Sequence, residues 1–201
     1  MRIPLVLLML FALASASQAQ QPSSGTQKPQ KPSSTDTQKS STGAQKSAPH
    51  DASADGAFVM KAAQANMAEV ELGKLATEKA MRDEVKKFGQ MMIDDHTKAG
   101  DELKMIATQK NITWPTEIDR EHKALETKLS KLSGAEFDRA YIQAMVDGHK
   151  KVAADVRKES TSGKDADVKT WAMKALPTVE MHLKQAETLN KTAHTNSTAH
   201  K

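Results

Sequence analysis

The sequence contains no cysteine, few aromatic residues and no long apolar run after its first twenty positions. The absence of cysteine excludes disulfide bonds, so an apolar core or a bound ligand must stabilise the fold. The aromatic residues are four Phe, two Trp and one Tyr among 201 residues. The one apolar run, at 3–14, is shorter than the roughly 20 residues that a spanning helix needs. The mature protein is therefore predicted to have no transmembrane segment.

The first twenty residues have the pattern of an export signal. Arg2 precedes the apolar run, and mostly small residues follow it as far as Ala19. Ser17 and Ala19 supply the small side chains that are needed at the third and first positions before a cleavage site. We therefore predict a signal peptide at 1–19 and a periplasmic or otherwise exported protein. Association with the outer membrane is an open alternative to the soluble periplasm.

A polar segment follows at 20–55, and it has no Val, Ile, Leu, Met, Phe, Trp or Tyr. Such a segment cannot bury a core, and its Ser-rich steps ending in Gln-Lys are typical of low-complexity sequence. It is predicted to be a disordered linker that tethers the rest of the chain. The alternative is that this linker contacts the cell envelope. A disordered tail is predicted for 192–201.

The positive charge of the chain is spread too thinly to indicate a nucleic-acid partner. The net charge is +4, and Arg2, the linker and Lys201 each supply one of these charges, which leaves +1 for the segment between linker and tail. A nearly neutral segment with few aromatic residues lacks the basic surface that binds phosphates. Nucleic acid is therefore excluded as a partner, and nothing in the sequence indicates an oligomeric state.

After position 55 the apolar residues recur every three or four positions, which predicts amphipathic helices. Four such stripes run over 58–79, 85–106, 137–156 and 168–189. The connection at 110–132 is long enough to run the length of a bundle and is predicted to be helical from Glu117 onward. This long, partly helical crossover between the second and third long helices favours an all-α, ferritin-like four-helix bundle over 56–191.

Two aspartates are placed to cap helices. A side-chain oxygen at the position before a helix satisfies backbone N–H groups of the first turn. Asp55 is therefore predicted to cap the first long helix, and Asp165 is predicted to cap the fourth.

An internal repeat relates the second and third long helices. Residues 88–98 align with 141–151 at an offset of 53, and Gln, Met, Asp, His and Lys recur at identical places. The repeat predicts that the two histidines lie at similar heights in the bundle. Asp94 and Asp147 are turned about 200° from the histidines, and they are predicted to pair with the lysines four residues later.

Four polar side chains lie at or beside the apolar stripes near the middle of the bundle, namely Glu69, His96, His149 and His182. Burying such groups is costly unless they bond to one another or to a metal ion. Imidazoles with one carboxylate suit zinc, copper or iron, so a mononuclear transition-metal site is one interpretation. Met92 and Met145 lie one turn from two of the histidines and would favour copper. Methionine is also the usual gap-filler of protein cores.

Two other interpretations stay open. The same four residues could form a purely structural network in an envelope-associated interaction protein. A ferritin-like metal oxidase is the third interpretation, but its di-iron site needs a carboxylate three residues before His on two helices. Ile93, Val146 and Val179 occupy those positions. No catalytic residue is assigned, and a binding or structural module is favoured over an enzyme.

Several strings of the sequence resemble the bacterial family called domain of unknown function 4142. They are MAEVELGKLA at 67–76, MIDDH at 92–96, LSGAEFDRAY at 132–141 and LPTVEMHL at 176–183. The resemblance implies a ferritin-like helical fold, export across the inner membrane and no known catalytic activity. Members often carry the label of outer membrane protein. Gly148 stands where such sequences often have Asp.

Overall fold

The computed structural model describes residues 53–198. The predicted signal peptide at 1–19 and nearly all of the predicted linker at 20–55 lie outside these residues. The described helices are α1 (Ala54–Lys79), α2 (Asp83–Gln109), α3 (Arg120–Ser130), α4 (Gly134–Ser162) and α5 (Ala166–Thr198). In this part of the chain there is no β-strand, only an isolated backbone bridge between Ala80 and Gly134. The prediction of an all-helical fold is confirmed.

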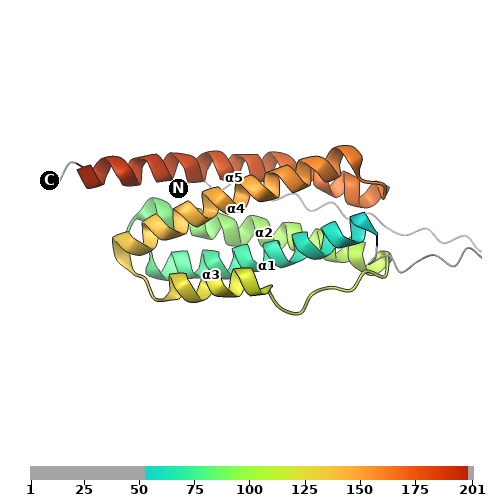
Figure 1. Cartoon of the computed structure of the whole chain (residues 1–201), viewed down its shortest axis with the longest axis horizontal. Coiled ribbons are helices and arrows are strands. Elements are labelled where there is room, and N and C mark those ends of the chain that lie inside the picture. The colour runs from blue at the N-terminus through green and yellow to red at the C-terminus, as the bar shows by residue number, and fades with distance from the viewer. Residues whose placement is uncertain (1–52, 199–201) are drawn as a thin grey trace, which may run out of the picture. The chain divides into compact units, whose positions relative to one another are not determined.

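The bundle consists of two helical hairpins, one of α1 with α2 and one of α4 with α5 (Figure 1). The turn at 80–82 is short, so α1 and α2 are antiparallel neighbours. The short helix α3 lies along α1 and carries the chain back, so that α2 and α4 run in the same direction (Figure 1). The predicted crossover is thus present, although its helix begins at Arg120 rather than Glu117.

The start of α1 differs from the prediction. Ser53 is the capping residue, and its side-chain oxygen accepts a hydrogen bond from the backbone N–H of Gly56 at 2.9 Å. Asp55 lies instead in the first turn of the helix and is buried. Its Oδ2 accepts hydrogen bonds from the backbone N–H groups of Lys164 and Asp165 at 3.0 and 2.5 Å. The sequence could not show that this carboxylate accepts hydrogen bonds from the turn between α4 and α5, because that turn is more than a hundred residues away.

The start of α5 agrees with the prediction, and its end lies further along the chain. Asp165 caps the helix as predicted, because its Oδ1 accepts hydrogen bonds from two backbone N–H groups of the first turn. The bundle was predicted to end at 191, but α5 continues to Thr198. No Gly or Pro interrupts the sequence from 191 to 198, so nothing in this stretch breaks the helical hydrogen bonds.

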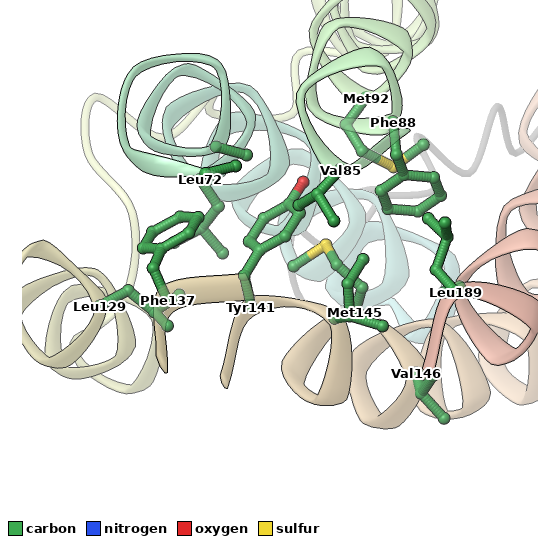
Figure 2. Packing of buried hydrophobic residues seen from close by; sticks show 14 residues of the cluster. Leu72, Val85, Phe88, Met92, Leu129, Phe137, Tyr141, Met145, Val146 and Leu189 are labelled. Atoms are coloured by element: carbon green, nitrogen blue, oxygen red, sulfur yellow. The ribbon is translucent and has the colours of Figure 1, made fainter. Parts of the chain in front are cut away.

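Two apolar clusters fill the bundle. The first cluster adjoins the turn between α1 and α2, and its centre is aromatic (Figure 2). Phe137 stacks on Tyr141 with ring centroids 5.5 Å apart, and Phe88 meets Tyr141 edge-on at 6.3 Å. The second cluster adjoins the turn between α4 and α5, where Phe58 contacts Trp171 edge-on. Phe88 and Tyr141 are equivalent positions of the repeat, so the repeat places matching residues at the same level.

A polar level separates the two apolar clusters. On α2 the first cluster reaches Met92 and the second begins at Leu103, so His96 lies between them. The same order holds for His149 on α4 and for His182 on α5. The level therefore lies inside the bundle, where each polar atom has lost its water and needs a partner.

The buried carboxylate of Asp138 holds the two hairpins together at the turn between α1 and α2. Its oxygens accept hydrogen bonds from the backbone N–H groups of Met81 and Arg82 at 2.9 and 3.0 Å. Asp138→Ala would leave both donors without this partner, so we expect a loss of about 2 to 4 kcal/mol in the free energy of unfolding. Urea denaturation measures this loss. Asp147→Ala, on the exposed face of the same helix, is the control and should change stability by about 0.5 kcal/mol or less.

Candidate metal centre

Three of the four predicted site residues come together on the polar level. The exposed fractions of His96, His149 and His182 are 8, 1 and 0%. Their ring centroids are 5.3 to 5.8 Å apart. One nitrogen of each ring lies within 4.8 Å of the corresponding nitrogens of the other two, an arrangement that could hold a metal ion.

Hydrogen bonds on the outer side of two rings fix their tautomers. His149 Nδ1 lies 2.9 Å from the backbone carbonyl oxygen of Met145, and His182 Nε2 lies 2.8 Å from Oδ2 of Asp95. A carbonyl and a carboxylate can only accept, so both of these ring nitrogens carry the hydrogen. The opposite nitrogens, His149 Nε2 and His182 Nδ1, are therefore lone-pair donors.

The third ring is fixed through Asn66 of α1. The amide nitrogen of Asn66 donates to the carbonyl of Ala62 at 2.8 Å, which turns its Oδ1 toward His96. His96 Nδ1 lies 2.9 Å from that oxygen and must donate to it. His96 Nε2 is thus the lone-pair donor of this ring.

The three lone-pair nitrogens are buried, and none has a hydrogen-bond partner. A buried polar atom without a partner costs about 1 to 3 kcal/mol, and three of them at one level are unusual in a folded protein. A metal ion is an appropriate partner, because imidazole ligands typically donate their second N–H to a carboxylate, a carbonyl or a similar acceptor. The chemistry of the donor set fits a transition-metal ion.

The electrostatics of the level keep two of the rings neutral. Burial lowers the pKa of His96 well below its usual value, and the neighbouring His149 and His182 lower it further. Burial also lowers the pKa of His182, although its hydrogen bond to Asp95 opposes the shift. A neutral imidazole keeps the lone pair that a metal ion requires.

Glu69, the fourth predicted residue, lies beside the three histidines but outside their group. Its Oε1 is 3.9 Å from His149 Nδ1, the nitrogen that already donates to Met145. Its Oε2 is buried without a partner. Burial raises the pKa of Glu69, and His149 and His122 oppose the shift. The structure thus brings Glu69 to the outer side of one ring rather than to the centre.

The methionines and aspartates of the repeat have other surroundings. Met92 and Met145 both belong to the first apolar cluster (Figure 2), which agrees with their use as core filler. Asp94 accepts a hydrogen bond from the side-chain amide of Gln90 at 2.8 Å, and Asp147 accepts one from Gln143 at 3.0 Å. These bonds replace the predicted pairs with lysine. They also show that the repeat extends to matched surface contacts.

Sequence reasoning missed Asn66 and Asp95, the two side chains that orient His96 and His182. Asn66 lies three residues before Glu69 and so shares its helix face, a signal that was available. Asp95 directly precedes His96, but no periodicity shows that it reaches across to α5. Its counterpart in the repeat is Gly148, where an added Cβ would lie 3.8 Å from Oε1 of Glu69. An aspartate there would set two carboxylates side by side, which glycine avoids.

The centre lies on the wall of a cleft of about 870 Å³ between the hairpins. All three histidines line this cleft, together with Glu69 of α1 and His122 of α3. Small side chains of α1 and α4 form part of its walls, among them Ala62, Ala65 and Ala144.

Among the described helices, none is both long enough and apolar enough to cross a membrane.

Comparison with known proteins shows one structural likeness and a family. The solved structure of CopM in the Cu(I)-bound form aligns with a TM-score of 0.58 and 16% sequence identity, over 69% of this chain and 96% of that chain. At this identity the likeness concerns the helical fold. No curated protein matches the sequence. The family model described as Domain of unknown function (DUF4142) matches residues 38–189, and the chain therefore belongs to this family.

Proposed function

We propose that this chain is an exported, ferritin-like helical module that binds one transition-metal ion through His96, His149 and His182. The observation that carries the proposal is that each ring has one nitrogen held by an acceptor and one buried nitrogen without a partner. Glu69 stands in this proposal as a neighbour of His149.

One nitrogen from each ring lies at a spacing close to what coordination needs. Nitrogens at most 4.8 Å apart share a point within about 2.8 Å of each, compared with about 2.0 to 2.1 Å for a zinc–imidazole bond. Small movements of the side chains would close this difference. Imidazole ligands suit zinc, copper and iron, and the structural neighbour CopM is known in a Cu(I)-bound form. Copper therefore belongs among the metals to test.

The remaining parts of the proposal rest on topology and on the N-terminal sequence. The parallel course of α2 and α4, joined through α3, is the order expected of a ferritin-like bundle with one crossover. The pattern of 1–19 supports export. The polar linker at 20–55 supports a tether that could place the bundle near the envelope.

The rival interpretation, a purely structural Glu/His network, fits the geometry less well. In such a network the buried nitrogens would bond to one another or to Glu69. Here the lone-pair nitrogen of every ring lacks a hydrogen bond, and Glu69 Oε2 lacks one too. A di-iron oxidase is disfavoured because Ile93, Val146 and Val179 occupy the places of its carboxylates.

Elemental analysis of the mature protein, purified without an affinity tag, tests the proposal. We expect close to one equivalent of zinc, copper or iron after supplementation, and almost none in the His96→Ala, His182→Ala variant. The bound metal should also raise the melting temperature. At a free metal concentration of 100 times Kd, binding increases the free energy of unfolding by about 2.7 kcal/mol. Less than about a tenth of an equivalent, with an unchanged melting temperature for all three metals, would contradict the proposal.

A further inference from the structure

The three histidines form an incomplete set of ligands. A closed structural zinc site has four protein ligands, whereas a site with three leaves one position open. Within the described residues, no fourth His, Cys, Asp or Glu joins the group of His96, His149 and His182. Glu69 approaches the protonated side of His149, 3.9 Å from Nδ1, and so does not face the lone-pair nitrogens.

The three rings border a cleft, which is the nearest space from which a fourth ligand could come. All three rings line the cleft of about 870 Å³ between the two hairpins, a volume within the range of roughly 300 to 1,000 Å³ that is typical of ligand sites. Ala62 and Ala65 of α1 and Ala144 of α4 narrow this cleft very little, because their side chains end at Cβ. A small molecule could therefore reach a metal ion that the rings hold.

The charge of the site selects the class of that molecule. Imidazole ligands bring no negative charge, so a divalent ion between them keeps its full positive charge, and an uncompensated charge in a buried place is costly. Within residues 53–198, Asp95 is the only carboxylate hydrogen-bonded to one of the three rings, and its side chain is 38% exposed. A ligand that brings a negative charge to the open position removes this cost.

We propose, on the basis of the proposed metal site, that the centre is open to the cleft and takes a small anion from solvent as its fourth ligand. The protein then acts as an exchange-competent metal site rather than as a closed structural one. Ala65 lines this cleft with a small side chain, so a larger residue there should hinder the entry of the anion.

The test uses the mature protein loaded with Co(II), whose visible absorption reports its coordination. Cobalt stoichiometry is measured first, and sodium azide is then titrated at constant ionic strength. We expect a saturable change in the visible spectrum of the wild type. Ala65→Leu, which narrows the cleft, should weaken azide binding on the order of tenfold while cobalt stays bound. Ala57→Leu is the matched control, because Ala57 is exposed on the same helix and does not line the cleft.

The outcomes separate the two proposals. Failure of cobalt to bind with one equivalent contradicts the metal site itself, and with it the anion. Bound cobalt with a spectrum that azide does not change contradicts the open position alone. Equal azide affinity in Ala65→Leu and Ala57→Leu overturns the cleft as the route.

Discussion

Replacing His149 with leucine is expected to abolish high-affinity metal binding and, at the same time, to make the metal-free protein more stable. The substitution removes Nε2, which is buried without a partner. The carbonyl of Met145 loses the ring as a donor, but it still accepts the backbone hydrogen bond of its own helix. We expect a gain of about 1 to 2 kcal/mol in the free energy of unfolding. Metal affinity should fall on the order of a hundredfold or more.

Urea denaturation in the presence of a chelator measures the stability, and a competitive metal titration measures the affinity. His122→Leu is the matched control, since His122 is partly exposed, hydrogen-bonded to Asp119 and outside the group of three rings; it should leave metal affinity unchanged. A structural network makes the opposite prediction for His149. A loss of stability greater than about 2 kcal/mol with unchanged metal affinity would establish that rival interpretation.

Gly89→Ala is expected to destabilise the protein by about 1 to 3 kcal/mol, although alanine is the better helix former. An added Cβ at Gly89 would lie 2.7 Å from Cβ of Ala76 and 2.9 Å from the backbone oxygen of Gly73. The helices α1 and α2 must then separate, because a backbone atom cannot turn away as a side chain can. The separation would also pull His96, two turns further along α2, away from Asn66.

Gly100→Ala provides the matched control on the same helix. Its added Cβ would meet only Cβ of Asn66, at an ordinary 3.7 Å. This variant should therefore gain about 1 kcal/mol from helix propensity. Thermal and urea unfolding of the two alanine variants measure the contrast. Equal stability of the two would show that the close approach at Gly89 does not hold the hairpin together.

Much of the fold follows from local features of the sequence. Apolar residues every three or four positions determine where helices form, because each helix must turn one face to the core. The repeat of 88–98 in 141–151 places His96 and His149 at one height, and their ring centroids are indeed 5.8 Å apart. Local sequence does not determine the helix ends, since Asp55 binds the distant turn between α4 and α5, and α5 continues to Thr198.

The candidate centre needed information that is not local. Helical periodicity assigns a face to His182 within an arc of roughly 100°, but it cannot say which nitrogen of the ring meets Asp95. Nor can it separate Glu69 from the three histidines, because all four lie on the inward side of their helices. A rotation of one helix by a fraction of a turn would change which of these groups meet.

By itself, therefore, the sequence determined an all-helical chain with a crossover and one mid-bundle level of buried histidines, because these depend on residue periodicity and loop length. Only the tertiary structure decided that Asn66, Asp95 and the carbonyl of Met145 hold the outer nitrogens while three lone pairs stay free. The physical reason is that packing sets the rotation and spacing of the helices. The close approach of Gly73 and Gly89, for example, sets the spacing of α1 and α2. That spacing determines which polar atoms find partners.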